Sequence, residues 1–171
     1  MQITAVRGTE GRDRVYVTRD DGTEVWWSWN SYGRGLAHDL VHWVVESEAG
    51  LTEGLWGLVA DGVDPSRVNK AAERIATGVT LRDMSGRDTD QLVHAELLAA
   101  AVGRLAHATV EDALAGVAEE AERFGVPPVA GLDADLLERM HERCDALNRR
   151  WQATAPDAGL VLAWPPSDVD P

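Results

Sequence analysis

The sequence predicts an α+β fold, in which a small N-terminal antiparallel sheet packs with a mostly helical C-terminal two-thirds. Apolar and polar residues alternate up to Asn30, with the period of two that half-buried strands show. After Asn30 the apolar residues recur every three or four positions, which is the period of amphipathic helices. The length of 171 residues suits a single globular domain over 1–171, with 165–171 as a loose tail.

Three strands are expected in the N-terminal part. They are "QITAVRG", "RVYVTR" and "TEVWWSWN", and each places alternate residues on one side. The segment "RDDG" at 19–22 predicts a turn between the second and third strands, because Asp-Gly tolerates positive φ angles. Tryptophans usually build cores, so we expect Trp26, Trp27 and Trp29 to pack against helices.

The middle of the chain predicts short helices separated by glycines. One helix is expected to begin near Leu36, and a second to run through "LTEGLWGLVADG" and end at Gly62. The segment "DPSRVNKAAERIATG" predicts a third helix, with Asp64 as N-cap, Pro65 in its first turn and Gly78 at its end.

Long helices are expected in the second half. Asp88 predicts the start of a helix that either runs unbroken to about Phe124 or restarts at Thr109. Asp133 predicts the start of a last helix through Trp151. Its apolar stripe repeats every three or four residues and comprises Leu136, Met140, Cys144, Leu147 and Trp151. The segment "GLVLAWP" is expected to form a final strand that returns to the N-terminal sheet.

Composition and charge narrow the choice of partners. The net charge of −13 repels nucleic acid and anionic membranes, so neither is expected as a partner, whereas a protein partner or a homo-oligomer is compatible with it. The single cysteine, Cys144, excludes an internal disulfide framework and suits a reducing cytoplasm. The first residues have no apolar stretch typical of a signal peptide, so a cytoplasmic location is expected.

The stretch "GLAHDLVHWVVESEAGL" at 35–51 contains a candidate metal site. On a helix, His38, His42 and Glu46 form one stripe at the border of the apolar face. Imidazoles at i and i+4 can bind one metal ion, and Glu46 can add an oxygen or orient an imidazole by a hydrogen bond. The spacing therefore predicts a divalent metal such as zinc, bound less tightly as the pH falls through about 6.5, where imidazoles protonate.

The five residues "HDLVH" resemble the zincin motif H-E-x-x-H, with Asp39 at the position of that family's glutamate. The resemblance implies that His38 and His42 are metal ligands and that Asp39 is the base of a metal-dependent hydrolase. Aspartate is one methylene shorter than glutamate, which shortens its reach. A longer stretch, from "LAHDLVHWVVE" through "GLWGLVADG", resembles an uncharacterised family of hypothetical proteins from GC-rich bacteria, and no activity is implied by that resemblance.

His94 is the third ligand expected from the sequence. It lies near the centre of the apolar face of the helix that follows Asp88, and a buried imidazole needs a polar partner. The pair His38 and His42 can be part of such a partner. The alternative is a core histidine that bonds to a backbone carbonyl or a carboxylate.

Two classes of function remain open at this point. The first is a metal-dependent hydrolase or metal-binding protein, with His38, His42 and His94 as ligands and Asp39 and Glu46 as the assisting catalytic residues. The second is a non-catalytic protein-binding or assembly module, in which the histidines are structural.

Overall fold

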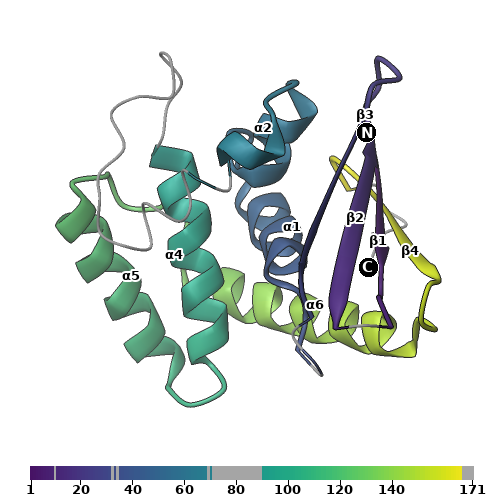
Figure 1. Cartoon of the computed structure of the whole chain (residues 1–171). Helices are drawn as coiled ribbons and strands as arrows, with labels where there is room; N and C mark the ends of the chain where they lie inside the picture. Colours follow the sequence, from purple (N-terminus) through teal and green to yellow (C-terminus); the bar gives the residue numbers. More distant parts are fainter. Residues whose placement is uncertain (10, 32, 34, 69, 71–89, 167–171) are drawn as a thin grey trace.

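The structure is a computed structural model that describes residues 1–9, 11–31, 33, 35–68, 70 and 90–166. It has the predicted α+β fold, with an N-terminal antiparallel sheet and helices in most of the remaining described chain. In Figure 1 the helices gather on one side of the sheet. Most of the helix expected between Asp64 and Gly78 lies outside the described residues, as does the expected tail after 166.

The sheet contains four strands within the described residues. They are β1 (Gln2–Val6), β2 (Arg12–Thr18), β3 (Glu24–Asn30) and β4 (Gly159–Ala163). Their order is β3-β2-β1-β4, and every neighbouring pair is antiparallel. The predicted C-terminal strand thus pairs with the first strand of the chain, which places both on the same layer of the fold (Figure 1).

The turn between β2 and β3 has the predicted geometry. The amide of Gly22 donates to the carbonyl of Arg19 over 2.9 Å, and the amide of Arg19 donates to the carbonyl of Thr23 over the same distance. Gly22 has a φ of +82°, a conformation that favours glycine because it has no Cβ. The Asp-Gly pair is therefore what permits the tight connection.

Five helices lie within the described residues. They are α1 (His38–Ala49), α2 (Leu55–Ala60), α4 (Asp90–Arg104), α5 (Val110–Phe124) and α6 (Ala134–Ala153). The predicted start at Asp88 lies outside the described residues, but the chain from Asp90 to Phe124 forms two helices. Thr109 caps the second one by accepting a hydrogen bond from the amide of Asp112. Asp133 caps α6 in the same way through the amide of Leu136, as predicted. None of the described helices is long and apolar enough to cross a bilayer.

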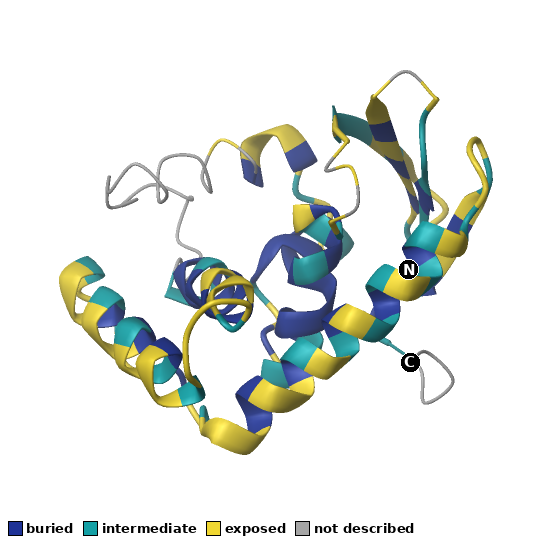
Figure 2. Ribbon diagram, turned by 90° about the horizontal axis from the view of Figure 1, so that it is seen from below, coloured by how far each residue is buried: buried dark blue, intermediate teal, exposed yellow. Residues whose placement is uncertain are grey.

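Helix α1 lies at the centre of the helical layer. It packs against α2, α4 and α6, and its Trp43 side chain is fully buried and donates a hydrogen bond to the carbonyl of Ala163 in β4 over 2.9 Å. Figure 2 shows that the buried residues concentrate in this centre, whereas α5 and α6 expose their outer faces. The residues of α1 are therefore held from several sides, which fixes their side chains.

The three tryptophans of β3 do not share one environment. Trp27 and Trp29 are partly buried and pack against the core, as predicted. For Trp26 the expectation is wrong, because its side chain is 65% exposed. Successive residues of a strand point to opposite faces of the sheet, so Trp26 faces away from the helices when Trp27 faces them.

Helix α6 allows a direct test of the core. Leu147 is fully buried, so Leu147→Ala should lower the free energy of unfolding by about 2–5 kcal/mol in urea denaturation. Glu142 is exposed on the same helix, and Glu142→Ala should change the free energy of unfolding by no more than about 0.5 kcal/mol.

Burial raises the pKa of the Cys144 thiol to about 12, so thiol reagents should label it slowly until the protein unfolds. Fast labelling in the folded state would contradict this packing.

Candidate metal centre

The candidate site is built around Glu46, a carboxylate on α1 that is completely buried. Its Oε1 accepts a hydrogen bond from the amide of Leu55 over 2.8 Å, and its Oε2 accepts one from the amide of Trp56 over 2.9 Å. These amides belong to the first turn of α2 and have no acceptor within that helix. Gly54 makes this contact possible, since a Cβ there would come within 2.3 Å of the Glu46 carboxyl carbon. Glu46 therefore joins α1 to α2.

Glu46 also fixes the orientation of His42, one turn earlier on α1. The Nδ1 atom of His42 lies 3.0 Å from Oε1 of Glu46. An ionised carboxylate can only accept hydrogen bonds, so the hydrogen in this contact belongs to Nδ1 of His42. Nε2 then points away from Glu46. The pair has the arrangement in which a carboxylate orients the imidazole of a metal-binding histidine.

Among the described residues, Nε2 of His42 has no hydrogen-bond partner, although the side chain is buried. The nearest polar contact given by the structure is Oε1 of Glu96 on α4, at 3.4 Å, and it lacks hydrogen-bond geometry. An unpartnered buried nitrogen is uncommon in folded proteins and calls for a physical explanation. This nitrogen is also the atom that a metal ion would bind.

Glu96 and His38 complete a group of three ligand atoms with His42. Nε2 of His38 lies 3.8 Å from Oε2 of Glu96, and one ligand atom from each of the three residues lies within 4.8 Å of the others. Tetrahedral zinc with bonds of about 2.0–2.1 Å holds its ligand atoms about 3.3 Å apart. The three residues are therefore close enough to bind a metal ion after a small contraction.

The charges at the site depend on each other. Burial opposes protonation of His42, but the carboxylates of Glu46 and Glu96 outweigh it and raise the pKa of His42 to about 10. Burial opposes ionisation of Glu96, but the neighbouring His42 outweighs it and lowers the pKa of Glu96. Burial and the charge of His42 lower the pKa of His38. The metal-free site at neutral pH thus contains one protonated and one neutral imidazole.

His94 lies elsewhere in the structure. It is buried on α4 as the sequence indicates, but its Nε2 lies 2.7 Å from the carbonyl oxygen of Pro127. It is not part of the group formed by His38, His42 and Glu96. This contact matches the alternative of a core histidine that bonds to a backbone carbonyl.

The side chain of Asp39 binds to a tryptophan of the sheet and not to the candidate metal ligands. Its Oδ2 accepts a hydrogen bond from the indole of Trp27 over 2.7 Å, and its backbone carbonyl accepts one from the indole of Trp56. Burial raises the pKa of Asp39, and the bond from Trp27 opposes that rise. The carboxyl of Asp39 does not belong to the group of three ligand atoms, so its first role in the structure is to anchor Trp27.

Glu96 is the site residue that the sequence reasoning missed. It is the only acidic residue between positions 91 and 104, in a helix that is otherwise mostly apolar. A lone carboxylate among buried leucines and alanines needs a polar partner, which is a signal that could have identified it. Glu96 lies two residues from His94 on the same helix, but it faces α1, whereas His94 faces Pro127.

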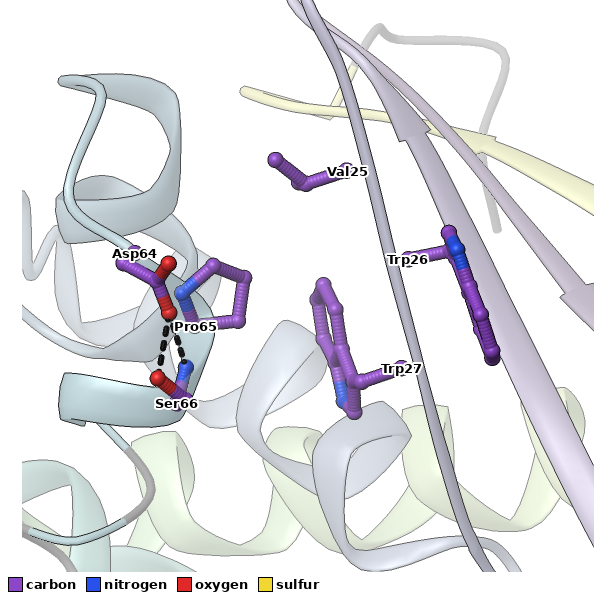
Figure 3. Close-up of a pocket in the computed structure, with 6 residues that line it drawn as sticks. All are labelled: Val25, Trp26, Trp27, Asp64, Pro65 and Ser66. Atoms are coloured by element: carbon purple, nitrogen blue, oxygen red, sulfur yellow. Dashed lines mark hydrogen bonds between the residues drawn. The ribbon is translucent and has the colours of Figure 1, made fainter.

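A hollow of about 250 Å³ lies between β3 and the segment at 64–66. Figure 3 shows Val25 and Trp27 directed towards Pro65, whereas Trp26 points away to the other face of the sheet. Trp27 connects this hollow to Asp39 through its indole hydrogen bond. Asp64 is the carboxylate among the described residues that line the hollow, and it already accepts from the amide and hydroxyl of Ser66.

Comparisons with known proteins add no family to this geometry: no family model matches the chain, and neither a curated protein nor a solved structure is similar to it.

The role of Glu46 as a buried acceptor predicts a large loss of stability on substitution. Glu46→Gln should lower the free energy of unfolding by about 3–5 kcal/mol, because it removes the charge that compensates His42 and turns an NH₂ group towards backbone donors. The matched control is Glu120→Gln, whose partly exposed partner is Arg123 on the same helix, and its cost should be about 1 kcal/mol or less. Equal losses in urea denaturation would contradict the role assigned to Glu46.

Proposed function

We propose that this protein binds a divalent transition metal ion, with zinc as the first candidate, at His38, His42 and Glu96. The observation that carries the proposal is the buried Nε2 of His42, which has no hydrogen-bond partner in the described part of the chain and lies beside Glu96. Leaving such an atom unsatisfied costs about 1–3 kcal/mol. A metal ion bound to Nε2 would remove this cost.

The donor set supports zinc. Two imidazole nitrogens and one carboxylate oxygen form the ligand set of several zinc hydrolases, in which three protein ligands leave a fourth position for a water or substrate. The side chain of His38 is 47% exposed, so solvent reaches the group from that side. We therefore propose hydrolysis as the reaction class, since zinc with an open position supplies Lewis-acid activation of a water or a carbonyl group.

The two further carboxylates have different roles in this proposal. Glu46 is a positioning residue, because both of its oxygens are used by α2 and His42. Asp39 is the candidate base, and its raised pKa and its position beside His38 in the chain support this role. To act as a base, Asp39 must release the hydrogen bond that it accepts from Trp27.

A non-catalytic module is the second candidate, and the raised pKa of His42 favours it. Without a metal, the protonated His42 lies between Glu46 and Glu96 and forms an ion cluster that connects α1 with α2 and α4. The histidines would then be structural. The two candidates differ in what Nε2 of His42 binds, which is a proton in one case and a metal in the other.

Metal content distinguishes the two candidates. Protein purified without a histidine tag should bind one zinc ion, and His38→Ala, His42→Ala or Glu96→Ala should each remove most of this binding, because two ligands hold the ion poorly. The controls are His107→Ala, which changes an exposed histidine, and Asp39→Asn, which should keep the metal. Circular dichroism checks that each variant is folded.

The same panel separates Glu96 from His94. If Glu96 is the third ligand, His94→Ala should keep stoichiometric zinc, whereas the reverse result would assign that place to His94. A parent protein that binds no zinc, nickel, manganese or iron at stoichiometric level would overturn the metal proposal. The buried ion cluster would then be the function of these side chains.

The pKa of His42 predicts how pH changes the stability of the metal-free protein and its affinity for zinc. Its folded value of about 10 exceeds the ordinary 6.5, so protonation of His42 stabilises the metal-free fold fully below pH 6.5, and this contribution is lost as the pH rises through about 10. Zinc must displace that proton, so its affinity should rise over the same range. The sequence alone places the change near 6.5.

Urea denaturation with a chelator, and zinc titration against a competing chelator, measure the two trends. Glu96→Gln should weaken the dependence of stability on pH, because one of the two carboxylates beside His42 is removed. A metal-free protein whose stability rises from pH 6.5 towards 10 would contradict the protonation of His42.

A further inference from the structure

The face of the sheet that points away from the helices exposes large apolar side chains among polar ones. Three large apolar side chains are exposed among the described residues, namely Tyr16 (42%), Trp26 (65%) and Val161 (49%). All three occupy outward-facing positions, on β2, β3 and β4, respectively. Contiguous exposed apolar groups on a folded protein are typical of interaction surfaces.

The register of the strands places these side chains in one row, which also contains Thr4. Trp26 is opposite Tyr16, Tyr16 is opposite Thr4, and Thr4 is opposite Val161. The row therefore crosses all four strands at right angles to them. The rings of Tyr16 and Trp26 stack with their centroids 6.3 Å apart, which makes this end of the row a flat aromatic surface.

The charges on this face are arranged about the row. Arg12 and Arg14 are exposed on β2 on one side of it, level with Asn30 and Ser28 of β3. Glu24 is exposed on β3 on the other side, level with Thr18. The face is thus basic at one end and acidic at the other, in a protein whose net charge is −13.

We propose that a second copy of this chain docks on this face. The two copies are related by a twofold axis that runs along the row of Trp26, Tyr16, Thr4 and Val161. Such an axis reverses the strand direction between the copies. Arg14 of one copy, two residues before Tyr16, then comes level with Glu24 of the other, two residues before Trp26 on the neighbouring strand. The contact occurs twice by symmetry, as in other isologous dimers.

The geometry of packed sheets suits this arrangement. Two sheets that pack face to face lie about 10 Å apart with their strands within about 30° of each other. Because the axis runs along the row, Trp26 and Tyr16 of one copy meet the same residues of the other copy. The tryptophan and tyrosine fill the centre of the contact, where aromatic residues are enriched in interfaces. Arginine and glutamate lie at its rim, where opposite charges fix the register more than they add affinity.

Charge complementarity favours a second copy over other occupants. The two arginines are too few to overcome the repulsion between nucleic acid and a chain of net charge −13. The opposed basic and acidic ends match each other under a twofold axis without any further partner.

Sedimentation equilibrium of the full chain at about 0.15 M salt tests the proposal. The parent should sediment as a dimer at micromolar concentration. Trp26→Ser should sediment as a monomer, and circular dichroism should show that it is folded. Glu138→Ser, an exposed change on α6, should remain dimeric as the control. A parent that stays monomeric up to about 0.1 mM, or a Trp26→Ser dimer of unchanged affinity, would overturn the proposal.

A charge exchange tests the axis itself. Arg14→Glu and Glu24→Arg should each weaken the dimer about tenfold or more, and the double variant should regain most of the loss, because the pair is restored with opposite sign. The same exchange at Arg149 and Glu138 on α6 should leave the dimer unchanged. Single variants without effect, or no recovery in the double variant, would contradict this axis. In a monomeric parent, quenching of the tryptophan fluorescence by a single-stranded oligonucleotide that is lost in Trp26→Ser would instead assign the face to nucleic acid.

Discussion

The structure around the candidate site depends on the carboxylate of Glu46. A carboxylate removed from water is costly unless donors surround it, and here the amides of Leu55 and Trp56 and the imidazole of His42 do so. The first turn of α2 provides two of these donors, and the positive end of a helix favours a negative group. The close approach excludes any side chain at Gly54. The buried charge of Glu46 thereby determines where α2 begins, why position 54 is a glycine and how His42 is oriented.

The orientation of His42 has consequences for chemistry. With Nδ1 held by Glu46, Nε2 can only face the space between α1 and α4, where Glu96 and His38 lie. Three potential ligands therefore meet without a loop or a mobile segment, since all of them are on helices that pack together. Sites held by rigid elements keep their geometry within narrow limits, which favours metal binding. The same arrangement also stabilises a proton on His42, so proton and metal compete for one atom.

Local patterns allowed much of the fold to be predicted. Alternation marked β1, β2 and β3, the Asp-Gly turn joined two of them, and Asp133 marked the start of α6. These signals depend on residues close together in the sequence. Trp26 escaped the prediction because composition suggests burial, whereas strand alternation decides the face on which a side chain lies.

The site was predictable only in part. The i and i+4 spacing identified His38 and His42, and a further turn identified Glu46, since one helix face contains them all. The third ligand comes from another helix, and its choice depends on how α4 is rotated against α1, which no local pattern encodes. His94 and Glu96 are two residues apart on α4, and that rotation directs Glu96 to the histidines and His94 to Pro127.

In the proposed metal site, Nε2 of His42 binds the metal while Nδ1 keeps its hydrogen for Glu46. Nitrogen-15 NMR of the histidine side chains, recorded during a zinc titration, tests it most directly. Zinc should shift the Nε2 resonance of His42 to that of a metal-bound nitrogen and leave Nδ1 protonated, with saturation at one zinc per chain. Resonances of His42 that remain those of a doubly protonated imidazole at every zinc concentration would contradict it.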